Sequence, residues 1–148
     1  MGLIHDVCTA ADDPPPFVAL REIRLKCENG VEYSGLRADK HRARYPELTT
    51  AVFMQAPAAV FNVALDLART LNWTIAAAVE AEGRIEATAA TRFLRFKDDV
   101  VIRICAHGAG AQLDMRSASR IGVTDLGVNA RRISAFCQEL NNHLKTNS

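Results

Sequence analysis

The chain has 148 residues, of which 49% are hydrophobic and 24% charged, and its 18 Lys and Arg against 17 Asp and Glu give a formal net charge of +1. This balance excludes a strongly basic nucleic-acid-binding protein, and the mixture is that of a soluble globular domain. The length suits one domain, residues 1–148, that folds without disulfide or metal staples.

The first fifty residues predict little regular structure. Residues 1–16 are expected to form an extended surface arm, because the three prolines at 14–16 suit neither a helix interior nor a central strand, and Phe17 anchors its end. Polar and apolar residues alternate over 21–27 and 31–33 around Asn29-Gly30, which predicts a hairpin. Residues 37–46, with four Lys or Arg, predict a solvated loop or short helix, or alternatively an anion-binding patch.

Two amphipathic helices are predicted. The first begins near Pro57, places its apolar residues at three- and four-residue steps, and ends near residue 72. The second begins with Thr124 as N-cap and Asp125 in its first turn, and its apolar stripe runs to Leu144, so that the core covers residues 17–144 and residues 145–148 fray.

Between these helices the pattern predicts four strands, at residues 73–80, 84–96, 100–107 and 112–116. Short turns at 81–83, 97–99 and 108–110 separate them, and the Asp98-Asp99 pair is assigned to the second turn. The expected fold is α+β, a two-layer sandwich in which an antiparallel four-stranded meander is covered by two helices, with an N-terminal arm and a hairpin.

Several chemistries lack their usual signals. The four His residues are scattered, the four Cys residues form no CxxC pair, and no GxSxG elbow occurs, so we predict no metal, no cofactor and no catalytic residue. The thiols are expected to be reduced and mostly buried. The sequence has no apolar run that could span a membrane and no signal peptide, so a cytoplasmic location is expected.

The candidate site lies where the last strand passes into the last helix. Residues 116–132 contain four Arg and one Asp, a local net charge of +3, and a helix N-terminus favours anions. Arg116 and Arg120 could clamp a phosphate or carboxylate. Alternatively, the same side chains form a polar network that holds the strand to the helix. The candidate ligand-binding residues are Arg103, Asp114, Arg116, Ser117, Ser119, Arg120, Asp125, Asn129 and Arg132.

Two long segments carry a family resemblance. They are residues 96–103, Phe-Lys-Asp-Asp-Val-Val-Ile-Arg, and residues 114–133, which contain Arg116-Ser117-x-Ser119-Arg120 and Asn129-Ala130-x-Arg132. With Tyr45-Pro46 and residues 83–87 they resemble the bacterial and plastid family called domain of unknown function 1499, from about residue 3 to 144. The resemblance implies no established activity, and some members of the family are exported or attached to a membrane. The cysteine-rich start of other branches is absent here, so no metal or redox role is carried over from it.

Three functions follow from these observations. The first is a non-enzymatic binding or accessory module that holds a small anion, a lipid head group or a protein partner at the strand-to-helix corner. The second is an enzyme acting on a phosphorylated or carboxylated metabolite, with Asp98 or Asp114 as general base. The third is a structural or oligomerising domain. Nucleic acid is not an expected partner.

Overall fold

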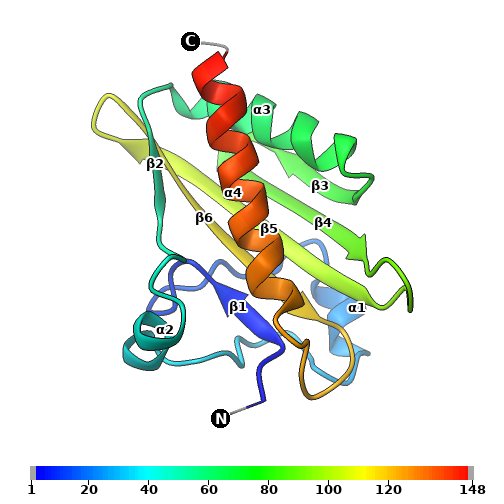
Figure 1. The fold of residues 1–148 in the computed structure, drawn as a ribbon. Helices are drawn as coiled ribbons and strands as arrows, with labels where there is room; N and C mark the ends of the chain where they lie inside the picture. Colours follow the sequence, from blue (N-terminus) through cyan, green and yellow to red (C-terminus); the bar gives the residue numbers. More distant parts are fainter. Residues whose placement is uncertain (1–2, 147–148) are drawn as a thin grey trace.

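Four consecutive strands of the chain are also neighbours in the sheet. A computed structural model describes residues 3–146, in which β3 (Thr74–Val79), β4 (Arg84–Ala90), β5 (Lys97–His107) and β6 (Gly110–Ser119) pair antiparallel in that order (Figure 1). The predicted meander is therefore confirmed. A short 3-10 helix, η1 (Glu80–Glu82), and Gly83 make the turn between β3 and β4.

The sheet has six strands rather than the predicted four. β1 (Asp6–Cys8) and β2 (Ala51–Phe53) pair with the free edge of β6, one after the other along its length. The N-terminal arm is thus partly a strand of the sheet, although Phe17 is buried as expected. Three-residue strands are too short for a periodic pattern, and for this reason the sequence does not reveal them.

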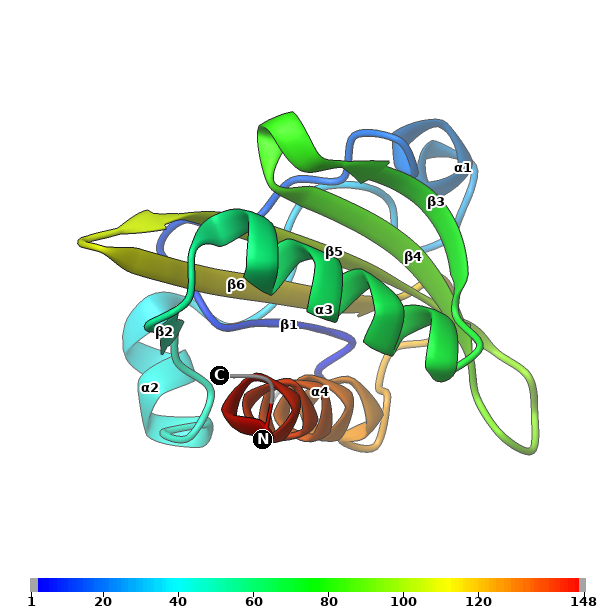
Figure 2. The ribbon, with the colours of Figure 1, turned by 90° about the horizontal axis from the view of Figure 1, so that it is seen from above.

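Two helices cover one face of the sheet. α3 (Pro57–Thr70) and α4 (Val128–Thr146) lie side by side on this face, hereafter the helix face (Figure 2). Buried side chains of both helices meet Ile85, Ile102 and Met115 of the sheet in one core. The Trp73 ring stacks on Phe136 of α4 with 5.2 Å between the ring centroids. The start of α3 at Pro57 agrees with the prediction.

The second helix begins later than predicted. Asp125, not Thr124, caps α4, since its carboxylate accepts the N–H groups of Gly127 at 2.7 Å and Asn129 at 3.3 Å. Leu126 and Gly127 both have a positive φ, which keeps them outside the helix. At the other end α4 continues to Thr146, and the rest of the predicted frayed tail, residues 147–148, lies outside the described residues.

The predicted hairpin is wrong. Residues 21–25 form a short helix, α1 (Arg21–Leu25), on the sheet face opposite α3 and α4, hereafter the back face (Figure 2). The alternation is inverted in space: Ile23 and Leu25 are exposed, whereas Arg24 is buried. The carboxylate of Glu86 explains the helix, because it accepts the N–H groups of Val18, Ala19 and Leu20 that precede α1. The basic segment forms α2 (Ala38–Arg44), one of the two predicted alternatives.

The turn predicted at residues 97–99 is also displaced. β4 ends at Ala90, residues 91–96 make the connection, and Asp98 and Asp99 belong to β5. Their buried carboxylates replace the apolar residues that normally mark a strand, and therefore the sequence looks like a turn there. Phe93, which falls within the predicted strand 84–96, lies in this connection and is exposed.

Candidate functional site

The nine predicted site residues lie around β6 on both faces of the sheet and do not form a single cluster. Successive residues of a strand point to opposite faces. Ser117 and Ser119 therefore face α4, whereas Asp114 and Arg116 face the back of the sheet, where residues 9–35 cover them. The corner is thus built from two polar clusters, one on each face.

The cluster on the helix face joins β5, β6 and the start of α4. Asn129, fully buried, accepts hydrogen bonds from Ser117 Oγ at 2.6 Å and Arg132 Nη1 at 3.0 Å. Its amide nitrogen donates to Ser119 Oγ at 2.9 Å and to Asp125 at 2.7 Å. Together with Asp125, the cluster brings together five of the nine predicted residues.

Asp98 completes this cluster. Arg132 Nη1 lies 2.8 Å from Asp98 Oδ2, and only 11% of the arginine side chain and 2% of the aspartate are exposed. The cation of the helix is therefore already paired with a carboxylate of β5. The consequence is a fixed link between the start of β5 and the first turn of α4.

On the back face, Arg116 forms the first of two buried ion pairs. Its guanidinium donates to Asp6 Oδ1 at 3.0 Å and to Oδ2 at 2.9 Å, a bidentate pair that is nearly inaccessible to solvent. It also donates to the carbonyls of Pro15 and Val31 and lies 4.5 Å from the centroid of the Phe17 ring. The arginine that we expected to clamp a ligand thus holds the N-terminal segment.

The second back-face pair involves Arg120. Its Nε and Nη2 donate to the two oxygens of Asp99, each at 2.9 Å, and this hydrogen bonding raises the pKa of the Arg120 guanidinium above its ordinary value. Arg24 of α1 approaches the same carboxylate at 2.9 Å, and Thr88 donates to it at 2.8 Å. Sequence reasoning missed Arg24, because a hairpin would have turned it to solvent.

The remaining predicted pair, Arg103 and Asp114, lies farther along the strands. Asp114 accepts hydrogen bonds from the hydroxyls of Thr9 and Thr50 and from Arg103 Nη2 at 3.3 Å. Arg103 is partly exposed and also contacts Asp13. Both carboxylates considered as general bases are therefore already engaged: Asp98 forms an ion pair with Arg132, and Asp114 accepts hydrogen bonds from Arg103 and from two hydroxyls.

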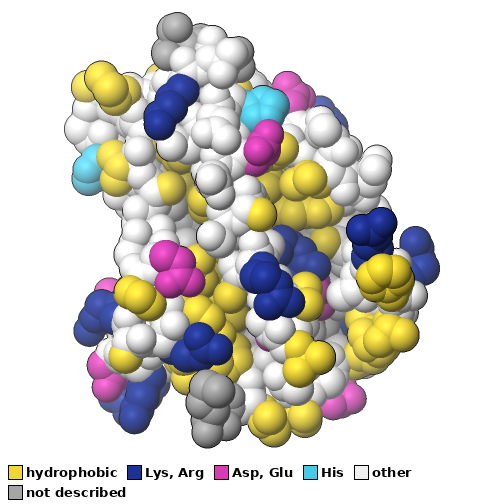
Figure 3. Space-filling view, in the orientation of Figure 1, with side chains coloured by type: hydrophobic (Ala, Val, Ile, Leu, Met, Phe, Trp, Pro, Cys, Tyr) yellow, Lys and Arg dark blue, Asp and Glu magenta, His cyan; other side chains and the backbone are white. Residues whose placement is uncertain are grey.

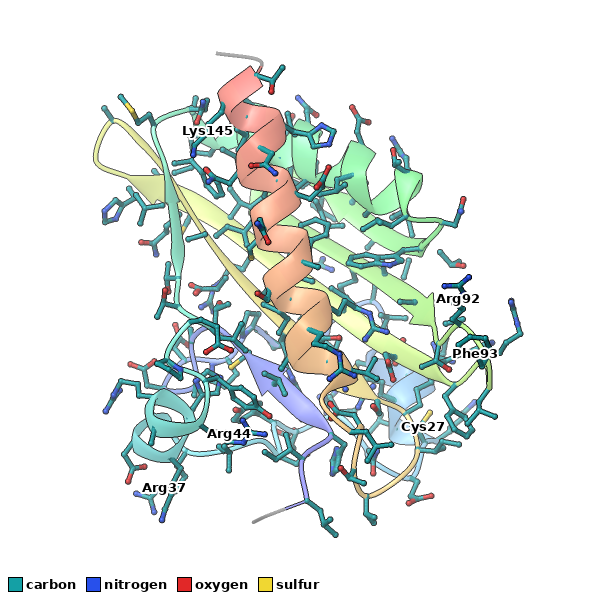
Figure 4. All side chains as sticks on the ribbon, viewed as in Figure 1. Cys27, Arg37, Arg44, Arg92, Phe93 and Lys145 are labelled. Carbon is teal, nitrogen blue, oxygen red and sulfur yellow. The ribbon has the colours of Figure 1, made fainter. Side chains whose placement is uncertain are left out.

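Cations without carboxylate partners occur on the neighbouring connection. Residues 91–97, Thr-Arg-Phe-Leu-Arg-Phe-Lys, hold three cations and no acid, and we call them the basic loop. Arg92, Arg95 and Lys97 are exposed and form no salt bridge within residues 3–146. The loop lies beside the predicted corner, because the N–H of Arg120 donates to the carbonyl of Lys97 at 3.1 Å. Figure 4 shows Arg92 and Phe93 at the outer edge of the molecule.

A separate cleft lies between α4 and the segment around β2. It has a volume of ≈ 350 Å³ and is lined by Thr9, Phe53, Cys137 and Asn141, among others. Burial raises the pKa of the Cys137 thiol to about 11, so the thiol remains protonated near neutral pH. Within residues 3–146, no group of three His, Cys, Asp or Glu side chains is arranged to hold a metal ion, and no helix is long and apolar enough to cross a membrane.

Comparison with known proteins identifies the family. The family model described as Protein of unknown function (DUF1499) matches residues 6–140, and the chain belongs to this family. No curated protein matches the chain. Among solved structures, the crystal structure of Ara h 8.0201 is similar with a TM-score of 0.50 and 10% sequence identity, over 66% of this chain and 95% of that one. At this identity the likeness concerns the fold alone.

Proposed function

We propose that this DUF1499 domain is a non-enzymatic binding module that presents one end of its sheet to a partner carrying an anionic group. That end, the corner end, comprises the basic loop and residues 120–127, which connect β6 to α4. The observation that carries the proposal is the contrast in charge pairing. Arg116, Arg120 and Arg132 form ion pairs with aspartates, whereas Arg92 and Arg95 form no salt bridge within the described residues.

In this proposal the predicted site residues have a structural role. The Asp98–Arg132 and Asp99–Arg120 pairs lie where β5 begins and where residues 120–127 depart. An anion at these arginines would have to displace a bound carboxylate. In the proposal, therefore, the paired arginines hold the ends of the basic loop and of residues 120–127 against the sheet. The anion contacts the cations of the basic loop that form no salt bridge.

An amide chemical-shift titration tests the proposal. Inorganic phosphate and glycerol 3-phosphate are added to the labelled domain, with chloride at equal ionic strength as reference. We expect saturable shifts at residues 91–97 and 120–127 that chloride does not reproduce. They are lost in Arg92→Gln/Arg95→Gln and retained in Arg69→Gln/Lys145→Gln, which removes the same charge from α3 and α4. Shifts that equal those of chloride, or that map to other segments, overturn the proposal.

A further inference from the structure

We infer that the anionic partner is a membrane surface containing acidic phospholipids, into which the apolar side chains of the corner end insert. This inference rests on the proposed function and names its partner. Its basis is a second feature of the same end: the cations are accompanied by large hydrophobic side chains that are half or more exposed, or nearly so.

The basic loop carries the largest of these side chains. Phe93 is 87% exposed, Leu94 73% and Phe96 46%. On the adjacent connection, Leu126 is 81% exposed, and Ile121 and Val123 are about half exposed. A single exposed apolar residue is ordinary, but a group of them on one end of a domain marks an interaction surface.

The two loops are neighbours in space. The N–H of Arg120, at the start of one loop, donates to the carbonyl of Lys97, at the end of the other. The side chain of Asn29 also donates to the carbonyl of Gly122, within residues 120–127. Figures 1 and 2 show both loops at the same end of the sheet, away from β2 and from the C-terminal end of α4. In Figure 3 hydrophobic and basic side chains gather together at the lower right, over the connection between β4 and β5.

The shape and the charge favour a membrane over a folded protein partner. The connection between β4 and β5 projects beyond the body of the domain (Figure 2), and a convex apolar loop suits insertion between lipid head groups. Cations alternate with apolar residues along it: Arg92, Phe93, Leu94, Arg95, Phe96 and Lys97. In such a sequence the apolar side chains reach the acyl boundary while the cations lie level with acidic head groups.

A second group of cations lies on α2, together with the acidic Asp39. α2 carries Arg37 just before its start and Lys40, Arg42 and Arg44 within it, and Figure 4 shows Arg37 and Arg44 at the lower edge of the molecule.

The backbone of Leu126 agrees with this assignment. Its φ of 53° is in the left-handed region, which a leucine rarely adopts, and its side chain obtains no burial in return. A strained backbone that exposes a large apolar side chain points to a selected role at this position. Glycine or asparagine would relieve the strain, but would remove the apolar group.

Vesicle sedimentation tests the inference with the whole chain. We expect binding to vesicles of phosphatidylcholine mixed with phosphatidylglycerol and little binding to phosphatidylcholine alone. Removing one cation lowers partitioning about fivefold, so Arg92→Gln/Arg95→Gln lowers it by about 25-fold. Phe93→Ser or Leu126→Asn lowers it on the order of tenfold. Met54→Ser, which removes a side chain that is 93% exposed at the opposite end, leaves binding unchanged.

A second readout places the inserted loop. Tryptophan at position 93, introduced as Phe93→Trp, should be quenched by brominated acyl chains, whereas Met54→Trp should not. Circular dichroism confirms that each variant is folded. Phosphate-induced shifts at the basic loop without vesicle binding indicate a soluble phosphorylated partner, which overturns the membrane inference and leaves the proposed function standing. Equal binding to vesicles with and without phosphatidylglycerol overturns the anionic part of both, and absence of shifts and of vesicle binding overturns both.

Discussion

Asp99 carries a buried negative charge that compensates two arginines of the back face. Its carboxylate receives four donors from three residues: Arg24, Arg120 and Thr88. In Asp99→Asn the charge disappears and one oxygen becomes an NH₂ group that faces arginine donors. Arg24, which is 1% exposed, then retains the neutral carbonyls of Gly30, Ala118 and Ser119 as acceptors and the Phe17 ring, whose centroid lies 4.8 Å from its guanidinium carbon, but no carboxylate. The variant therefore leaves a buried cation without compensation.

The expected loss in the free energy of unfolding is about 3–5 kcal/mol, the usual cost of removing one member of a buried ion pair. Arg120 contributes less to this loss, because its side chain is 17% exposed and can turn to water. Urea unfolding followed by circular dichroism measures the change. Asp66→Asn is the matched control, since its pair with Arg69 lies on the surface at 3.9 Å and is worth about 0.5 kcal/mol or less.

A double variant separates the ion pair from other effects of the substitution. Arg24→Met removes the buried cation, so Asp99→Asn added to Arg24→Met should cost at least about 1 kcal/mol less than Asp99→Asn in the native chain. Additive losses would refute the reasoning. So would a loss below about 1 kcal/mol in the single variant, because the buried pair would then contribute no more than a surface pair.

Three other predictions follow from single residues. Gly83→Ala should lower stability by about 1–3 kcal/mol in the same assay, because a Cβ there would lie 1.9 Å from the Ile104 carbonyl oxygen and Gly83 has a φ of 64°. Burial lowers the pKa of His41, so below about pH 6.5 the unfolded chain binds a proton that the folded chain does not. The urea midpoint should therefore decrease as the pH is lowered below about 6.5, and this decrease should be smaller in His41→Gln. The exposed Cys105 should react with a thiol reagent in the folded protein at pH 8, whereas Cys8, whose pKa burial raises to about 11, should react only on unfolding.

The sequence predicts those elements whose pattern is long and driven by burial. α3 and the four meander strands place apolar residues on one face, and their positions follow from periodicity. The segment 21–33 shows where this reasoning fails. There the apolar Ile23 and Leu25 face water and Arg24 faces the sheet, because a distant carboxylate, Asp99, compensates its charge. An alternation of polar and apolar residues therefore does not prove that a segment is a strand. Nor does it show which of its side chains are buried, because a buried charge can be compensated by a distant residue.

The candidate site was identified by residue type, but not by arrangement. Charges counted along residues 116–132 sum to +3, yet Asp6, Asp98 and Asp99 from other strands lie against three of the arginines. Such pairing depends on strand register, which a single sequence does not give. Neither the cations of the basic loop nor the exposure of Phe93 can be recognised from the sequence, because its pattern predicts one continuous strand over residues 84–96.

Asp98 and Asp99 connect the buried ion pairs with the exposed basic loop. As consecutive strand residues they point to opposite faces, so one binds Arg132 of α4 and the other binds Arg120 and Arg24 behind the sheet. The acidic pair thereby ties the start of β5, which is also the end of the basic loop, to both layers that cover the sheet. Loops with fixed roots lose less conformational entropy when a partner immobilises them. In the proposed function, the buried ion pairs hold this surface in position, and the exposed cations of the basic loop meet the anionic partner.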